Sequence, residues 1–302
     1  MAGMSQRLRS LVRPMLGRLG YDVQRVRPGV WLVQRPGGRR PPLAMQRIGS
    51  AKTAPVLLAE NDGTSKRRRE HRNTIDQYYA DEHLSWLLEK LRIDCVLDVG
   101  ANRGQFAQRL RRLGYAGRIA SFEPVSRLLE DLRLAAADDA QWSVFPFALG
   151  EEDGSAEINV VPGKMSSLRK PSDFGREWST KLRTPHPETI EVRRLDTVFD
   201  EAISGLADPR ILLKLDTQGY DLQAFRGAGD RLADVLALQS ELACVPIYED
   251  MPRMPEQLNE YESAGFEISA MFPVTRHRKS MRVIEFDVLM VRADASGGPD
   301  SA

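Results

Sequence analysis

The stretch from Cys95 to Gly104, with the sequence CVLDVGANRG, constrains the fold of this 302-residue chain more than any other. Its apolar first half, interrupted only by Asp98, predicts a buried strand of a parallel sheet. Gly100 and Gly104 then allow a sharp turn and a close approach of the backbone to a ligand. A helical pattern beginning near Phe106 follows at once. This strand–turn–helix unit is typical of nucleotide-binding α/β domains, which bind their ligand beyond the carboxyl end of the strand.

The glycine spacing favours one kind of nucleotide over another. The dinucleotide fingerprint G-x-G-x-x-G fails here, because Asn102 and Gln105 stand where glycines are required. A nucleotide-dependent oxidoreductase is therefore only an alternative. The turn G-x-N-x-G after an acid in the strand instead suits a ligand with no phosphate at the turn. S-adenosylmethionine (SAM), which carries an amino acid and a sulfonium, is such a ligand.

An acid also ends the second predicted strand, which covers residues 118–122. Glu123 is followed by Pro124, which fixes the exit of the chain. A carboxylate at this place can accept hydrogen bonds from both hydroxyls of a ribose. The alternative role for Glu123 is a helix N-terminal acid that the helix dipole stabilises.

Six short motifs occur in one order along the chain: residues 98–104, 121–124, 148–150, 166–168, 195–197 and 213–219. With them the chain resembles the FkbM family of SAM-dependent methyltransferases over about residues 80–292. The resemblance implies an α/β class I methyltransferase (Rossmann-like) fold with a mostly parallel seven-stranded sheet and a terminal antiparallel hairpin. It also implies methyl transfer, usually to an oxygen of a sugar or natural product. Many relatives carry an acid in place of Gln218, so no acid–base role is predicted there.

The charge distribution suggests a basic N-terminal extension over residues 1–80, a methyltransferase domain over residues 81–292 and a polar tail over residues 293–302. Residues 1–72 hold sixteen Lys and Arg but four Asp and Glu, although the whole chain has a net charge of +1. An apolar stripe at residues 8–19 predicts an amphipathic helix, which could lie on an anionic membrane or pack on the acidic domain. No base-reading motif supports nucleic acid as a partner.

The surroundings of the two cysteines and the hydropathy predict a cytoplasmic protein, which the basic helix could bring to the inner membrane surface. Cys95 and Cys244 lie in apolar runs, which favours reduced, buried thiols. No apolar run reaches the length of a membrane span, and no signal peptide is visible. The basic or Pro/Gly-rich segments 35–47 and 66–72 are predicted to be linkers.

Other elements complete the predicted domain. A helix is expected from Asp81, with an apolar face that includes Trp86, before the first strand. The third strand, over residues 142–147, leads to Phe147 and Ala148. These two residues are candidates for the edge of the adenine site, although ordinary core packing is the alternative. Residues 266–272 and 283–292 form the expected hairpin.

A long irregular stretch, residues 162–187, is predicted to be a lid over the methyl acceptor. His186 is the one histidine near the predicted site and could act as a general base. The alternative is that His186 is a solvated loop residue. Tyr248, in a later loop, is a candidate for the wall of the acceptor pocket.

The strand Ile211–Asp216 carries two charges in an apolar setting. Strand alternation places Lys214 and Asp216 on one side, where they could pair, and Asp216 is expected to face the methyl donor. A buried ion pair without catalytic function is the alternative. A further strand, residues 235–238, leads to Glu241 at the same edge of the sheet. Glu241 and Asp216 could bind sugar hydroxyls, share a cation or accept the acceptor proton.

These patterns predict a SAM-dependent methyltransferase that acts on a hydroxyl of a small molecule or glycolipid. Cofactor binding is assigned to Asp98, Gly100, Asn102, Gly104, Glu123, Pro124, Phe147 and Ala148, and proton transfer to Asp216, Glu241 or His186. No metal ligand is predicted, since the spacing gives no ligand signature. A non-catalytic SAM-binding protein of the same fold is the second hypothesis.

Overall fold

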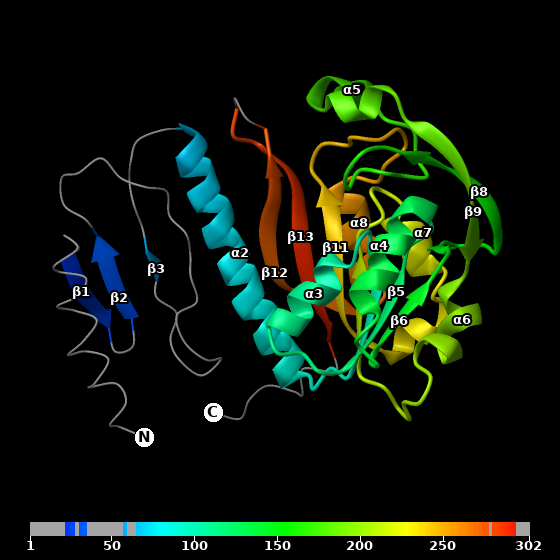
Figure 1. Cartoon of the computed structure of the whole chain (residues 1–302), viewed down its shortest axis with the longest axis horizontal. Coiled ribbons are helices and arrows are strands. Elements are labelled where there is room, and N and C mark those ends of the chain that lie inside the picture. The colour runs from blue at the N-terminus through cyan, green and yellow to red at the C-terminus, as the bar shows by residue number, and fades with distance from the viewer. Residues whose placement is uncertain (1–21, 28–29, 35–56, 59–64, 278–279, 294–302) are drawn as a thin grey trace. The chain divides into compact units, whose positions relative to one another are not determined.

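The computed structural model describes residues 22–27, 30–34, 57–58, 65–277 and 280–293 (Figure 1). The chain divides into two compact units, Met1–Tyr79 and Ala80–Ala302. In the first unit, β1 (Asp22–Arg27) pairs antiparallel with β2 (Val30–Gln34), and β3 (Leu57–Leu58) runs parallel to β2. The predicted helix at residues 8–19, the linker at residues 35–47 and the end of the polar tail lie outside the described residues.

Helix α2 spans Ser65–Lys90 and is longer than predicted. The prediction of a linker at residues 66–72 is wrong, because they belong to this helix. Lys, Arg and Glu have high helix propensity and no Gly or Pro interrupts the segment, so a charged helix can form there. In the second unit, Leu84 and Leu87 of α2 are fully buried, whereas Trp86 is 55% exposed. The prediction that Trp86 lies on the buried face of this helix is therefore wrong.

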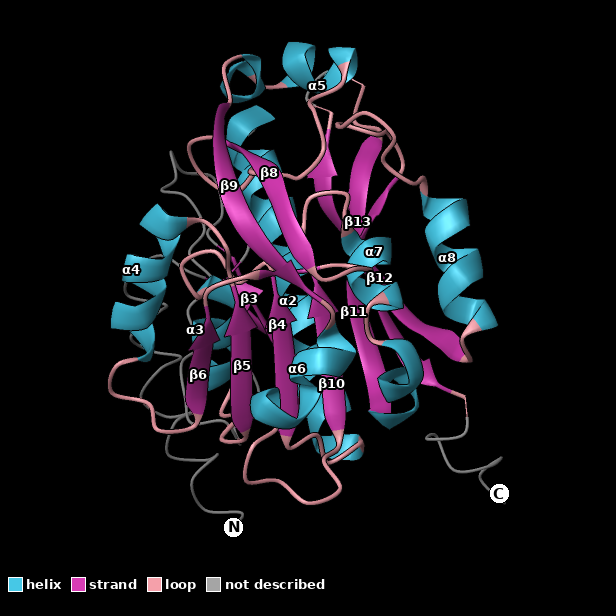
Figure 2. Ribbon diagram, turned by 90° about the vertical axis from the view of Figure 1, so that its right-hand side faces the viewer, coloured by secondary structure: helices cyan, strands magenta, loops and turns pink. Residues whose placement is uncertain are grey.

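A seven-stranded sheet forms the centre of the second unit, in the order β12-β13-β11-β10-β4-β5-β6 (Figure 2). Its strands are β4 (Cys95–Val99), β5 (Arg118–Phe122), β6 (Trp142–Phe145), β10 (Ile211–Leu215), β11 (Val235–Ala243), β12 (Phe266–Arg276) and β13 (Val283–Arg292). Strands β6, β5, β4, β10 and β11 are mutually parallel, and β13 is antiparallel to both of its neighbours. The predicted mostly parallel sheet with a terminal antiparallel hairpin is confirmed.

Apolar residues cover both faces of this sheet, because successive strand residues point to opposite sides. Val96 of β4 packs in a cluster with residues of α2, α3 (Gln105–Arg112) and α4 (Ser126–Ala136). Its neighbour Leu97 packs on the other side with residues of α6 (Leu195–Ala202), α7 (Asp221–Arg226) and α8 (Met254–Ser263). A 3-10 helix, η2 (Gly229–Asp234), precedes β11. This three-layer arrangement leaves the carboxyl ends of β4, β5, β10 and β11 facing the same way.

A second, three-stranded sheet follows β6 in the chain. It has the order β7-β9-β8, with β7 at Ala148–Leu149, β8 at Gly154–Val160 and β9 at His186–Arg193. The segment between β8 and β9, residues 161–185, covers all but the last two residues of the predicted lid at residues 162–187 and keeps the name lid. It holds α5 (Asp173–Trp178) and the 3-10 helix η1 (Thr180–Arg183), so it is not irregular throughout.

The lid packs on the carboxyl end of the main sheet. Leu182 of η1 lies in one apolar cluster with Ala243 at the end of β11, Ile284 of β13 and Tyr248. Both cysteines are free thiols, Cys95 buried and Cys244 half-buried. No helix among the described residues is long and apolar enough to cross a membrane.

Candidate functional site

The glycine turn after β4 joins three neighbouring strands. Gly100 and Gly104 have φ angles of 77° and 78°, in the left-handed region where a Cβ is unfavourable. The backbone N–H of Gly100 donates to Phe122 O at the end of β5 (3.0 Å). A Cβ on Gly100 would lie 2.1 Å from the backbone oxygen of Asp216, which follows β10. Glycine is therefore needed at position 100 so that the ends of β4 and β10 can meet.

Glu123 lies directly against this turn. Its carboxylate accepts one hydrogen bond from the backbone N–H of Asn102 (2.8 Å) and another from that of Val125 (2.9 Å). Pro124 connects Glu123 to Val125 in the chain. Burial raises the pKa of Glu123 to about 7, although the two N–H donors and the charge of Lys214 lower it. Each oxygen keeps a lone pair with which it can accept a hydrogen bond from a ligand.

Asp98 is wholly buried beneath the turn and pairs with Lys214 of the adjacent strand. Its Oδ1 lies 2.9 Å from Lys214 Nζ, and its Oδ2 accepts a hydrogen bond from Ser121 Oγ (3.3 Å). Burial lowers the pKa of Lys214, but the carboxylates of Asp98 and Asp216 outweigh it and raise that pKa overall. Lys214 is closer to Asp98 than to Asp216, from which it is separated by 3.6 Å. Asp98, which the sequence assigned to cofactor binding, is therefore a buried partner of Lys214 with no exposed surface.

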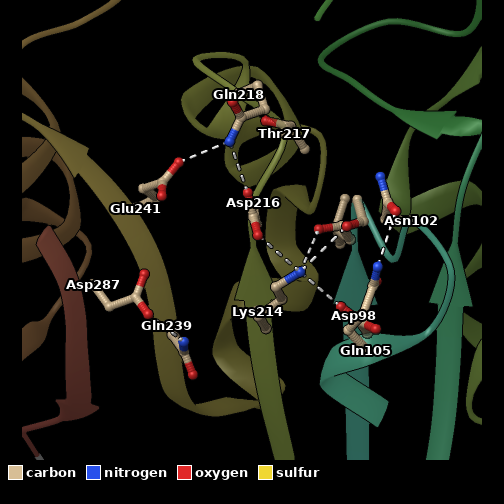
Figure 3. A network of polar contacts seen from close by, with 12 residues as sticks. Asp98, Asn102, Gln105, Lys214, Asp216, Thr217, Gln218, Gln239, Glu241 and Asp287 are labelled. Atoms are coloured by element: carbon tan, nitrogen blue, oxygen red, sulfur yellow. Dashed lines mark hydrogen bonds and ion pairs between the residues drawn. The ribbon is translucent and has the colours of Figure 1, made fainter. Parts of the chain in front are cut away.

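Gln218 connects the two carboxylates that the sequence placed at this edge (Figure 3). Its Nε2 donates to Asp216 Oδ1 (3.1 Å) and to Glu241 Oε2 (2.9 Å). The hydroxyl of Tyr248 lies 3.1 Å from Gln218 Oε1 and 2.8 Å from Met165 O in the lid. Gln218 itself has a φ of 56°, so a tight turn aims its side chain. Gln218, for which no acid–base role was predicted, thus positions both carboxylates and links them through Tyr248 to the lid.

Glu241 lies inside β11, which runs to Ala243 and not only to residue 238 as predicted. It is 9% exposed. Burial and then the nearby charges of Glu285, Asp216 and Asp287 raise its pKa well above the usual range. Glu285 and Asp287 of β13 were not among the predicted site residues. Two acids spaced two residues apart in an otherwise largely apolar strand, and so on one face of it, were the signal for them.

The remaining predicted residues lie away from these carboxylates. Phe147 packs on Phe122, with ring centroids 5.8 Å apart, under the guanidinium of Arg193. Ala148 begins β7 and pairs with β9. His186 is exposed at the start of β9, opposite Val160, and no hydrogen bond or ion pair of the described residues joins it to Asp216 or Glu241.

The residues around the glycine turn fit a SAM molecule in their chemistry. The carboxylate of Glu123 has free lone pairs for ribose hydroxyls, and the left-handed turn lets the backbone approach a ligand. The side chain of Asp216 is 43% exposed and can face a cationic sulfonium. The aromatic side chains of Phe122, Phe145 and Phe147 pack together at the ends of the adjacent strands.

Solved structures with a similar backbone include methyltransferases. A fibrillarin of Aeropyrum pernix with natively bound S-adenosyl-L-methionine is 14% identical, with 66% of each chain covered and a TM-score of 0.38. The magnesium protoporphyrin IX methyltransferase of Synechocystis PCC 6803 with bound SAM is 12% identical over 78% of this chain and 86% of that chain, at a TM-score of 0.40. An rRNA methylase of Streptococcus thermophilus is 11% identical over 71% of this chain and 94% of that chain, at a TM-score of 0.37. This chain thus spans about two thirds of the fibrillarin.

Comparison with curated proteins gives no match. A family model, the methyltransferase FkbM domain, matches residues 98–268, from the strand before the glycine turn into the first strand of the terminal hairpin. This match covers more than half of the 302 residues. The chain therefore belongs to the FkbM methyltransferase family, whose members use SAM as the methyl donor.

Proposed function

We propose that this methyltransferase transfers the methyl group to a hydroxyl oxygen of a sugar, glycolipid or natural product. The observation that carries the proposal is the pair of carboxylates from neighbouring strands, Asp216 and Glu241, that one amide of Gln218 bridges. They lie at the edge of the sheet where the glycine turn meets the end of β10. A hydroxyl must lose its proton when it is methylated, so a carboxylate at this place can act as the general base that accepts the proton.

The cofactor half of the site is assigned to the glycine turn and Glu123. Glu123 accepts hydrogen bonds from the ribose hydroxyls with the lone pairs that the backbone leaves free. When bound, SAM supplies an electrophilic methyl carbon, so the protein mainly provides alignment and proton removal. The Asp98–Lys214 pair holds the ends of β4 and β10 in register beneath this half of the site.

The acceptor half is assigned to Asp216 and Glu241. Asp216 is the more exposed carboxylate and would accept the proton that the acceptor hydroxyl loses on methylation. Glu241, whose raised pKa favours the protonated form, positions the acceptor by hydrogen bonding. Gln218 is a positioning residue, because it fixes the distance between the two carboxylates.

The test measures S-adenosylhomocysteine formation and a mass gain of one methyl group on hydroxyl acceptors. Asp216→Asn should lower turnover by about 100-fold or more, while calorimetry shows unchanged binding of S-adenosylhomocysteine. Asp200→Asn, which changes an acid that is 82% exposed on α6, is the matched control and should leave turnover unchanged. Full turnover by Asp216→Asn would exclude Asp216 as the base. Cofactor binding without turnover on any acceptor would instead favour a non-catalytic binding protein.

A further inference from the structure

The turn after β10, residues 216–219, carries two side chains on which the proposed proton transfer depends (Figure 3). It contains Asp216 and also Gln218, whose amide bridges Asp216 and Glu241. Gln218 and Gly219 have φ angles of 56° and 92°, both in the left-handed region. A residue with a side chain rarely adopts this conformation, and it persists where neighbouring contacts hold it. The contacts that hold this turn therefore set the geometry of the two carboxylates.

The first part of the turn is held from the main sheet by the buried carboxylate of Asp221, the first residue of α7. Its Oδ1 accepts hydrogen bonds from the backbone N–H of Thr217 (2.8 Å) and from the hydroxyl of the same residue. Its Oδ2 accepts from Ser240 Oγ of β11 (3.0 Å), and this Oγ lies 2.8 Å from Tyr261 Oη of α8. Thr217 is therefore fixed to the body of the domain.

The last two residues of the turn are held by the lid. The hydroxyl of the buried Ser167 donates to Gln218 O (2.7 Å) and accepts from the backbone N–H of Arg169 (3.0 Å). Arg169 Nε donates to Gly219 O (2.6 Å). Each of the two left-handed residues thus gives its carbonyl oxygen to one lid side chain. Ser167 also belongs to the motif at residues 166–168, to which the proposed function assigns no role.

This part of the lid is itself bonded to a strand. Asn159 of β8 forms an antiparallel bridge with Ser167, in which each backbone N–H donates to the oxygen of the other residue (2.8 and 3.2 Å). Asn159 Nδ2 also donates to Arg169 O (3.2 Å). A side chain whose backbone is fixed to a regular element positions its partner more precisely than one on a free loop. The two lid side chains therefore connect the small sheet to the turn.

Building on the proposed function, we propose that Ser167 and Arg169 are positioning residues for methyl transfer, because they hold the turn in the conformation in which Gln218 bridges Asp216 and Glu241. They act through the turn and are neither general bases nor cofactor ligands. Loss of either hydrogen bond lets the turn relax, so that Asp216 is no longer aligned with the acceptor hydroxyl. A misplacement of about 1 Å is enough to reduce a rate about 100-fold. The lid is then part of the catalytic geometry as well as a cover for the acceptor.

Ser166 offers a matched control for Ser167. Its hydroxyl accepts from the backbone N–H of Val161 (3.1 Å) and lies 3.4 Å from Val161 O, so both of these contacts stay within the lid. Ser166→Ala and Ser167→Ala therefore remove the same group from adjacent residues, and only the second change removes a contact with the turn.

The test measures kcat and the acceptor KM of the full-length protein, with the hydroxyl acceptor that gains a methyl group in the test of the proposed function. Ser167→Ala should lower kcat about tenfold or more and change the KM less than about threefold, whereas Ser166→Ala should change both less than about twofold. Arg169→Ala should resemble Ser167→Ala, and Arg169→Lys, which keeps an N–H donor, should recover part of the lost kcat. Calorimetry should show unchanged binding of S-adenosylhomocysteine, and circular dichroism checks folding.

A double-mutant cycle separates positioning from a purely structural role. Gln218→Ala keeps the backbone oxygen that Ser167 contacts but removes the amide bridge. If Ser167 acts through this bridge, Ser167→Ala should lower the kcat of Gln218→Ala by less than about twofold further. Hydrogen exchange gives a second readout, which needs no acceptor. The backbone amide of Thr217 should exchange about tenfold faster in Ser167→Ala than in the parent and at the parent rate in Ser166→Ala.

Each outcome decides between the claims. An unchanged kcat in both Ser167→Ala and Arg169→Ala overturns the inference, as do losses that multiply in the double variant. Unchanged exchange at Thr217 in Ser167→Ala also overturns it. If Ser167→Ala loses turnover while Asp216→Asn keeps it, the positioning role stands and Asp216 is not the base. If no hydroxyl acceptor is methylated, the proposed function fails, and faster exchange at Thr217 still supports the hold of the lid on the turn.

Discussion

Substitution of Glu285 by Gln should stabilise the protein at high pH and leave its stability nearly unchanged at low pH. Burial is the main cause that raises the pKa of Glu285 from an ordinary 4.5 to about 7, against a hydrogen bond from Thr275, and Asp216 and Asp287 raise it further. Between these two pH values the folded protein binds more protons than the unfolded chain. The free energy of unfolding therefore falls as the pH rises from 4.5 through 7 and is lowest above 7.

The size of the effect follows from the same two pKa values. A rise from 4.5 to about 7 corresponds to about 3 kcal/mol of unfolding free energy above pH 8. Gln has nearly the same shape as Glu, can still accept the hydrogen bond from Thr275 and carries no charge to bury. We expect Glu285→Gln to gain about 1–3 kcal/mol at pH 8.5 and to change stability by less than about 0.5 kcal/mol at pH 5.

Urea unfolding followed by circular dichroism at several pH values measures this difference. Glu267→Gln is the matched control, because Glu267 is exposed on β12 of the same hairpin and its loss should be neutral at every pH. The reasoning is refuted if Glu285→Gln changes stability equally at pH 5 and pH 8.5. It is also refuted if the variant is less stable than the parent at pH 8.5.

Three further changes test the site in thermal unfolding and calorimetry. Gly114→Ala should lower the free energy of unfolding by about 1–2 kcal/mol, because its φ is left-handed, and Gly100→Ala should lower it by about 1–3 kcal/mol more, because only the Cβ at position 100 meets backbone atoms. Equal losses of stability in the two variants would contradict the close approach of Gly100 to Asp216. Lys214→Met should destabilise by about 3–5 kcal/mol, since Asp98 stays buried without a cation; a neutral result would argue against the ion pair. S-adenosylhomocysteine should bind more weakly as the pH falls through 7, because Glu123 becomes protonated, and Glu123→Gln should lose this dependence; a parent with no pH dependence would remove Glu123 from the ribose site.

The parts of the proposed cofactor half were largely predictable because they are local in sequence. The strand that ends at Val99, the left-handed glycines and Glu123 at the next strand end all follow from short patterns. Two adjacent parallel strands then bring these parts together, which is a general property of open α/β sheets. The family match over residues 98–268 and the seven-stranded sheet confirm the predicted fold class.

The acceptor half was harder to predict because its contacts are far apart in sequence. Gln218 bridges Asp216 to Glu241, and Gln218 and Glu241 are 23 residues apart along the chain. The lid was expected to be irregular, but α5 and η1 form there and pack on the ends of β11 and β13. His186 had seemed a candidate base because of its chemistry, yet it lies exposed on β9.

By itself, the sequence determined the alternation of strands and helices, the glycine turn and the family to which the chain belongs, because hydrophobic period and backbone freedom are local properties. Only the tertiary structure decided which charges meet. Register across β4 and β10 places Asp98 beside Lys214, and register across β11 and β13 places Glu241 beside Asp287. Such pairings depend on strand order and on one-residue register, which no single segment encodes, so the electrostatics of the acceptor side emerge only when the sheet is assembled.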